Sequence, residues 1–172
     1  MKKSLFIITT LILTFLSGCS CLCSKRQAKD LSSTINLYER KSVSLVKLIE
    51  SKDAAKELVI AKAKELVEIS RPILAGFQAK YPQCKGYLQT VLNNSQKMQS
   101  LSLAEIESKW HEGEALPEDA DTVCMEAKEL VVHPSTVVIL SKDNFTSAKN
   151  KEQMSDELNE VIEHMSELKE SI

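Results

Sequence analysis

The chain has 172 residues, a length typical of a single domain. With 22 basic and 24 acidic side chains it has no surplus of positive charge for a phosphate backbone, which argues against nucleic-acid binding. Glycine and proline are sparse, aromatic residues make up 5% of the chain, and no long stretch alternates cleanly between apolar and polar residues. We therefore expect an all-α protein, folded as a small antiparallel helical bundle.

The beginning of the chain has the pattern of a signal peptide. Lys2 and Lys3 give a short positive start, residues 5–16 form an uncharged apolar run, and Ser17 and Gly18 are the small residues that a signal peptidase requires. The apolar run is shorter than the roughly 20 residues that cross a bilayer as a helix. We expect this segment to be cleaved.

The sequence Leu16-Ser17-Gly18-Cys19 resembles the lipobox of bacterial lipoproteins. The resemblance implies that the Cys19 thiol receives a diacylglyceryl group, that cleavage occurs just before Cys19, and that the freed amine is acylated. Because two or more acyl chains hold a protein on a bilayer almost permanently, the mature chain would be anchored to a membrane. In this family an aspartate after the lipidated cysteine tends to retain the protein in the inner membrane. Ser20 follows here, which implies the periplasmic face of the outer membrane.

Cleavage of residues 1–18 would remove two lysines and no acidic residue, which leaves 154 residues with a net charge near −4. We interpret residues 19–29 as a lipidated tether and residues 30–172 as the helical domain. A tether of ten extended residues reaches at most about 35 Å and keeps the domain close to the bilayer. Cys21 and Cys23 we expect to be ordinary tether residues; the alternatives are a local bridge, pairing between molecules, or binding of a soft ion such as Cu(I).

Three segments carry mostly apolar residues at alternating spacings of four and three, which is the pattern of an amphipathic helix. Such apolar stripes must be covered, and antiparallel packing in a bundle covers them. The stripes consist of Leu31, Ile35, Tyr38, Ser42, Leu45 and Ile49; of Val59, Ala63, Leu66, Ser70, Ile73 and Phe77; and of Met154, Leu158, Val161, Met165, Leu168 and Ile172.

Prolines interrupt two helical patterns. The apolar phase of the second stripe continues unchanged across Pro72, so we expect a kinked but continuous helix there. Further along, we expect a helix over residues 122–132 that ends before Pro134, because the residue before a proline is biased away from helical geometry. A separate short helix starting at Pro134 would then include residues 137–140.

The middle of the chain carries helix start signals. Pro82 suits the first turn of a helix that carries Cys84. Ser102 and Glu105 form the pattern of a capping box, which predicts a short helix that runs to about Trp110. The glycine, proline and acidic residues that follow, at 111–121, predict a loop.

Cys84 and Cys124 are the remaining cysteines. In the oxidising periplasm two cysteines of one domain tend to be bridged, so we predict a Cys84–Cys124 disulfide. The alternative is two ordinary core positions, because a free cysteine packs as a small apolar residue.

No enzyme motif is complete in this sequence. His111-Glu112-Gly113-Glu114-Ala115 begins like the zinc-protease motif H-E-x-x-H, but alanine replaces the second histidine. The C-x-x-C-H motif of covalent haem, the E-x-x-H pair of di-iron bundles and the G-x-S-x-G elbow of serine hydrolases are absent. We expect no catalytic activity.

Two predicted helix ends carry residues that suit a metal ion. His111 and Glu112 end one helix, and Glu129 and His133 lie near the end of another. If the disulfide draws these ends together, the two imidazoles with Glu112 or Glu129 would suit Zn²⁺ or Cu²⁺. The alternative is that each histidine caps a helix C-terminus. His164, between Glu160 and Glu167 on its own helix, we interpret as part of a charge-paired surface.

Two classes of function remain open. The first is a non-catalytic envelope lipoprotein whose helical domain binds another envelope protein or supports assembly, for example through its acidic C-terminal helix. The second is a periplasmic lipoprotein that binds a metal ion or small ligand at the region of His111 and His133. The first class requires no residue that the chain lacks, and it is the leading expectation from sequence.

Overall fold

The computed structural model describes residues 20–118 and 120–171, with side chains from residue 31 onward except that of Ser166. The lipobox, Cys19 and the expected signal peptide lie outside the described residues, and so do the side chains of Cys21 and Cys23. Ile172, the last residue of the third predicted stripe, lies outside them as well. Within the described residues, no helix is both long and apolar enough to span a membrane.

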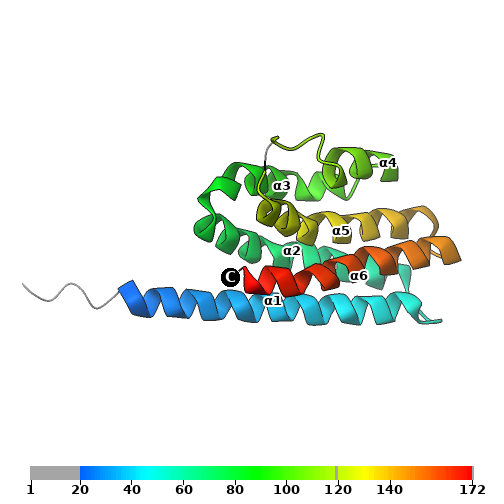
Figure 1. The fold of residues 1–172 in the computed structure, drawn as a ribbon. Coiled ribbons are helices and arrows are strands. Elements are labelled where there is room, and N and C mark those ends of the chain that lie inside the picture. The colour runs from blue at the N-terminus through cyan, green and yellow to red at the C-terminus, as the bar shows by residue number, and fades with distance from the viewer. Residues whose placement is uncertain (1–19, 119, 172) are drawn as a thin grey trace, which may run out of the picture.

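The described residues form six α-helices and no strand, which confirms the predicted all-α class (Figure 1). The long helices are α1 (Ser20–Glu50), α2 (Lys56–Lys80), α5 (Thr122–Asn144) and α6 (Ala148–Glu170). A 3₁₀ turn (Pro82–Cys84) leads into α3 (Lys85–Met98), and α4 (Leu103–Ile106) continues into a π-helical turn, η2 (Glu107–His111).

The four long helices form a bundle in which neighbours run antiparallel. Helix α1 packs on α2 and α6, and α5 packs on the same two helices from the other side (Figure 1). Helices α3 and α4 lie against α5 and cover its outer side. The connections between α1 and α2 and between α5 and α6 are short, as antiparallel neighbours require.

The three predicted stripes form the core of this bundle. Every described member is buried except Leu31, which is partly buried and packs against the core. Burial of these apolar side chains supplies most of the free energy that holds the helices together.

The prediction of a helix break at Pro134 is wrong, because α5 runs from Thr122 to Asn144 with Pro134 inside it. A proline has no N–H to offer the carbonyl four residues earlier, which here belongs to Leu130. The buried hydroxyl of Tyr38 on α1 donates a hydrogen bond to that carbonyl oxygen at 2.9 Å. The carbonyl that Pro134 leaves without an intrahelical partner is therefore satisfied by another helix.

The region of Pro72 has the predicted structure, whereas residues 20–29 do not. Helix α2 runs continuously through Pro72, as the unbroken apolar phase predicts. Residues 20–29, interpreted from sequence as an extended tether, are instead the first turns of α1. As helix this segment spans about 15 Å rather than up to about 35 Å, because an α-helix rises 1.5 Å per residue.

The predicted disulfide is present between Cys84 and Cys124, with an S–S distance of 2.01 Å. It joins the 3₁₀ turn before α3 to the first turn of α5. The predicted capping box is also present, with the Ser102 side chain accepting from the Glu105 N–H and the Glu105 side chain accepting from the Ser102 N–H. These two features fix the segment between α3 and α5, which carries His111.

Candidate metal centre

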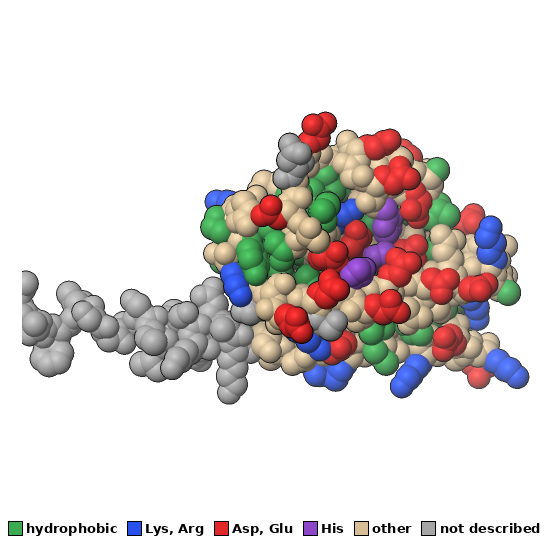
Figure 2. Space-filling model, in the orientation of Figure 1, with side chains coloured by type: hydrophobic (Ala, Val, Ile, Leu, Met, Phe, Trp, Pro, Cys, Tyr) green, Lys and Arg blue, Asp and Glu red, His purple; other side chains and the backbone are tan. Residues whose placement is uncertain are grey.

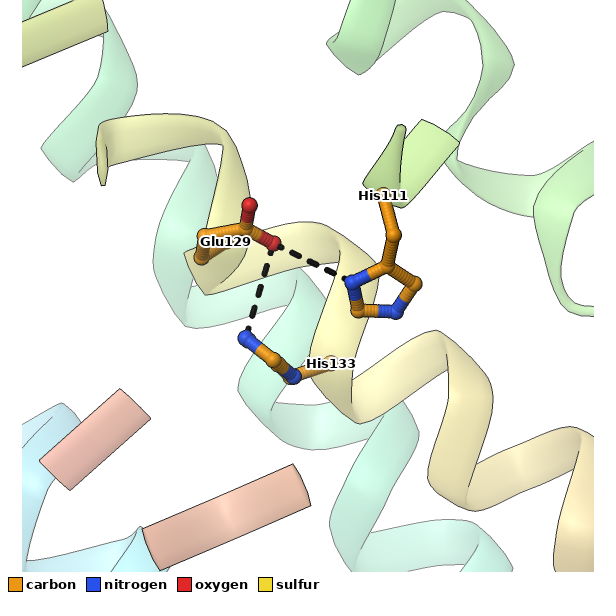
Figure 3. A group of neighbouring side chains, drawn as sticks. All are labelled: His111, Glu129 and His133. Atoms are coloured by element: carbon orange, nitrogen blue, oxygen red, sulfur yellow. Dashed lines mark ion pairs between the residues drawn. The ribbon is translucent and has the colours of Figure 1, made fainter. Parts of the chain in front are cut away.

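The candidate metal centre lies where the π-helical turn η2 meets the polar face of α5. Glu129 and His133 are four residues apart on α5 and therefore lie on the same face of that helix. His111 is the last residue of η2 and points toward them from the opposite side (Figure 3). The two imidazole rings meet edge to face with their centres 4.8 Å apart.

Local structure sets the position of His111. The π-helical turn ends at His111, and Gly113 then takes a positive φ of 89°, a conformation that residues with a side chain rarely adopt. The buried ammonium of Lys128 on α5 donates hydrogen bonds to the backbone carbonyls of Trp110 and His111. Lys128 therefore holds the end of η2 against α5 and brings His111 to the site.

The tautomer of His133 follows from its contact with α6. Its Nδ1 lies 2.8 Å from Glu157 Oε2, and a carboxylate oxygen can only accept a hydrogen bond. Nδ1 therefore carries the proton and donates a hydrogen bond to Glu157. In the neutral imidazole the lone pair is then on Nε2, which faces Glu129 (Figure 3).

The tautomer of His111 follows from Thr136 in the same way. The Thr136 hydroxyl donates a hydrogen bond to the Val132 carbonyl oxygen, 3.2 Å away. The hydroxyl oxygen can therefore only accept a hydrogen bond from the His111 ring. His111 Nε2, at 3.1 Å, therefore carries the proton and donates to Thr136. The lone pair of His111 is on Nδ1, and this atom also faces Glu129.

Glu129 completes the group, with one carboxylate oxygen facing both rings (Figure 3). Its Oε1 lies 3.1 Å from the ammonium nitrogen of Lys128, which leaves Oε2 for the histidines. Oε2 lies 3.7 Å from His111 Nδ1 and 3.5 Å from His133 Nε2, and it is buried without a hydrogen-bond partner (Figure 3). A buried acceptor without a partner costs about 1–3 kcal/mol, and more when it is charged.

Three lone-pair-bearing atoms therefore face one another with no proton between them when both histidines are neutral. All three lie within 4.8 Å of one another. Around a tetrahedral Zn²⁺ with ligands at 2.0–2.1 Å, neighbouring ligand atoms are about 3.4 Å apart. The separations from Glu129 Oε2 come close to this value, so small side-chain rotations would let all three atoms bind one ion.

The electrostatics of the site keep His111 neutral, so that one of its ring nitrogens retains a lone pair. Burial, together with the nearby His133 and Lys128, lowers the pKa of His111 to about 3. Burial lowers the pKa of His133 as well, but its hydrogen bond to Glu157 and the surrounding carboxylates outweigh this effect and raise that pKa. Burial raises the pKa of Glu129, which His133 and Lys128 only partly offset.

Other carboxylates surround the three ligand atoms. Glu107 lies in a second group with His111 and Glu157, and burial together with the charge of Glu157 raises its pKa. Glu160 on α6 is largely exposed, and its Oε2 lies 3.7 Å from His133 Nε2. Figure 2 shows the histidine side chains together on one face, surrounded by acidic side chains.

The structure brings together His111, His133 and Glu129, three of the four residues that the sequence suggests as metal ligands. Glu112, the fourth, is exposed and belongs to none of the described groups that could hold an ion. Sequence reasoning did not find Glu157, Thr136 or Lys128, which orient the ligands. The four-residue spacing of Glu129 and His133 indicated that both lie on one helix face. Glu157 lies on another helix, α6, and no sequence spacing connects it to His133.

Comparison of the chain with protein-family models, with curated proteins and with solved structures finds no match.

Proposed function

We propose that this protein binds a divalent transition-metal ion, Zn²⁺ or Cu²⁺, through His111 Nδ1, His133 Nε2 and Glu129 Oε2. The observation that carries the proposal is the buried Glu129 Oε2, which has no hydrogen-bond partner and faces His111 Nδ1 and His133 Nε2, the two nitrogens that carry lone pairs when both rings are neutral. A cation between these three atoms removes their mutual repulsion. Imidazole and carboxylate ligands suit both ions.

The orientation of the ligands supports the same proposal. A histidine that binds a metal ion usually donates its other ring N–H to a carboxylate, a carbonyl or another acceptor, which fixes the tautomer. Both histidines have such a partner here, Glu157 for His133 and Thr136 for His111. Three protein ligands leave a fourth position for water or for Glu160, whose carboxylate is close to His133.

A role in docking another envelope protein depends largely on the acidic residues of α6. Glu157, one of these residues, is buried and hydrogen-bonded to His133, so it offers nothing to a partner. Glu160 lies beside the same histidine. These contacts favour ion binding over protein docking for this face, and we assign no catalytic reaction to it.

We also propose that the metal-binding domain is held at the periplasmic face of the outer membrane by lipid on Cys19. The support is the lipobox and the apolar run before it. The variant Cys19→Ala should leave the membrane fraction or remain uncleaved, whereas the wild type should fractionate with the outer membrane.

Titration of the metal-free full chain, purified in detergent, with Zn²⁺ and Cu²⁺ against a competing chelator tests the metal site. We expect one tightly bound ion, and Glu129→Gln, which keeps the shape of the side chain, should weaken binding at least ten-fold. Glu112→Gln is the matched control and should bind as the wild type does. Binding no tighter than millimolar would contradict the proposed site, and tight binding that is unchanged in Glu129→Gln would show that the ion binds elsewhere.

A further inference from the structure

A second group of possible ligands lies further along the seam between α5 and α6. It consists of Glu126 on α5 with His164 and Glu167 on α6, and their ligand atoms lie within 4.8 Å of one another. His164 Nδ1 lies 2.8 Å from Glu126 Oε2. That oxygen is itself buried, and the His164 nitrogen is its close partner. An imidazole and two carboxylates thus converge from two helices.

The spacing along both helices connects this group to the buried centre. On α5, Glu126 lies three residues before Glu129, and on α6, Glu160 lies four residues before His164. Residues three or four apart share a helix face. The two groups therefore lie about one helical turn apart on the same seam, with Glu160 between them.

Exposure differs between the two groups. The side chains of His133, His111 and Glu129 are 4%, 17% and 18% exposed, whereas those of His164 and Glu160 are 39% and 62% exposed. An ion from solvent therefore reaches His164 directly, but it reaches His133 only past other side chains. The acidic side chains around the histidines lower the energy of a cation near this face and speed its arrival (Figure 2).

We propose that Glu126, His164 and Glu167 form a second, weaker and more exposed site for a divalent transition-metal ion, and that this site loads the buried centre by way of Glu160. The loading step rests on the proposed function of the buried centre, whereas binding at the second site does not. No bond other than metal coordination forms or breaks. The ion exchanges the carboxylates and imidazole of the outer group for those of the inner group.

The test uses the metal-free full chain in detergent. Calorimetric titration with Zn²⁺ counts the bound ions, and Cu²⁺ quenching of Trp110 in a stopped-flow instrument times the filling of the buried centre. Trp110 is the single tryptophan of the chain and is adjacent to His111, so its fluorescence reports that centre. We expect two Zn²⁺ in the wild type, the second bound at least ten-fold more weakly.

The variant His164→Ala should bind one Zn²⁺ with unchanged tight affinity, and Trp110 quenching should slow by about ten-fold. Glu167→Gln, which leaves the contact between His164 and Glu126 intact, should weaken the second ion if His164→Ala folds poorly. Glu152→Gln, an exposed carboxylate near the start of α6, is the matched control and should behave as the wild type.

Each other outcome contradicts a specific part of the proposal. One Zn²⁺ in the wild type, or two in His164→Ala, overturns the second site while leaving the buried centre supported. Loss of the second ion with an unchanged quenching rate overturns the loading step. A wild-type chain that binds no ion overturns both this inference and the proposed function.

Discussion

Glu157 on α6 accepts a hydrogen bond from Nδ1 of His133 on α5, with 2.8 Å between the two atoms. This bond turns the free lone pair of His133 toward Glu129. Removal of such a carboxylate partner commonly weakens metal binding 10- to 100-fold. We therefore expect Glu157→Ala to weaken Zn²⁺ binding by about this factor, measured by chelator competition. Glu157→Gln, whose amide oxygen can still accept the hydrogen bond, should lose less. Equal affinity in Glu157→Ala and the wild type would contradict the role assigned to Glu157.

A second prediction concerns Tyr38 and the proline inside α5. In Tyr38→Phe the Leu130 carbonyl oxygen loses the hydroxyl that donates a hydrogen bond to it. A buried acceptor without a partner lowers the free energy of unfolding by about 1–3 kcal/mol. Urea denaturation should show this loss. In a Pro134→Ala background the new N–H can reach the same carbonyl, so Tyr38→Phe should cost less there. The same cost in both backgrounds would show that Tyr38 does not compensate for Pro134.

The disulfide gives a third prediction. Cys84 and Cys124 are 40 residues apart in sequence, and the chain-entropy model assigns about 4 kcal/mol to closing a loop of that length. The double variant Cys84→Ala/Cys124→Ala should lose a free energy of unfolding of this order in guanidinium denaturation. Reduction of the wild type should lower its stability by a similar amount. No change on reduction would mean that the bridge constrains little in the unfolded chain.

The fourth prediction concerns the pH dependence of the metal-free protein. The pKa of His111 is about 3 in the folded state, against about 6.5 in the unfolded chain. Between these values the unfolded chain binds a proton that the folded protein does not. The contribution of His111 to stability is therefore full above about pH 6.5 and falls as the pH drops toward 3.

His133 acts in the opposite direction, because its pKa is raised, so a comparison of variants is needed to isolate His111. His111→Gln should lose less stability than the wild type when the pH is lowered from 7.5 to 5 in the presence of a chelator. Chemical denaturation at the two pH values measures this difference. Equal losses would indicate that His111 is already accessible to protons in the folded state.

Much of the fold could be predicted because it depends on local patterns. The apolar stripes predicted α1, α2 and α6, and Ser102 with Glu105 predicted the start of α4. The prediction failed at Pro134, where the outcome depends on a hydroxyl from Tyr38, 92 residues before Leu130 in sequence. No local pattern carries information about such a partner.

In the candidate site, too, local spacing could be predicted from the sequence, whereas contacts between helices could not. Glu129 and His133 lie on one helical face by their spacing alone, and the disulfide correctly suggested that His111 approaches them. Glu112 is adjacent to His111 in sequence, but η2 ends at His111 and leaves Glu112 exposed. His164 was paired from sequence with carboxylates of its own helix, whereas the structure shows Glu126 of α5 at 2.8 Å. The register between α5 and α6 decides these contacts, and a single sequence does not specify it.

X-ray absorption at the zinc edge, on the full chain loaded with one equivalent of Zn²⁺, tests the central claim most directly. We predict a four-coordinate ion with two imidazoles and one or two carboxylate oxygens at about 2.0–2.1 Å. The spectrum of His111→Ala should show one imidazole fewer. A spectrum without imidazole scattering, or one with six oxygen ligands, would contradict a metal centre built from His111, His133 and Glu129.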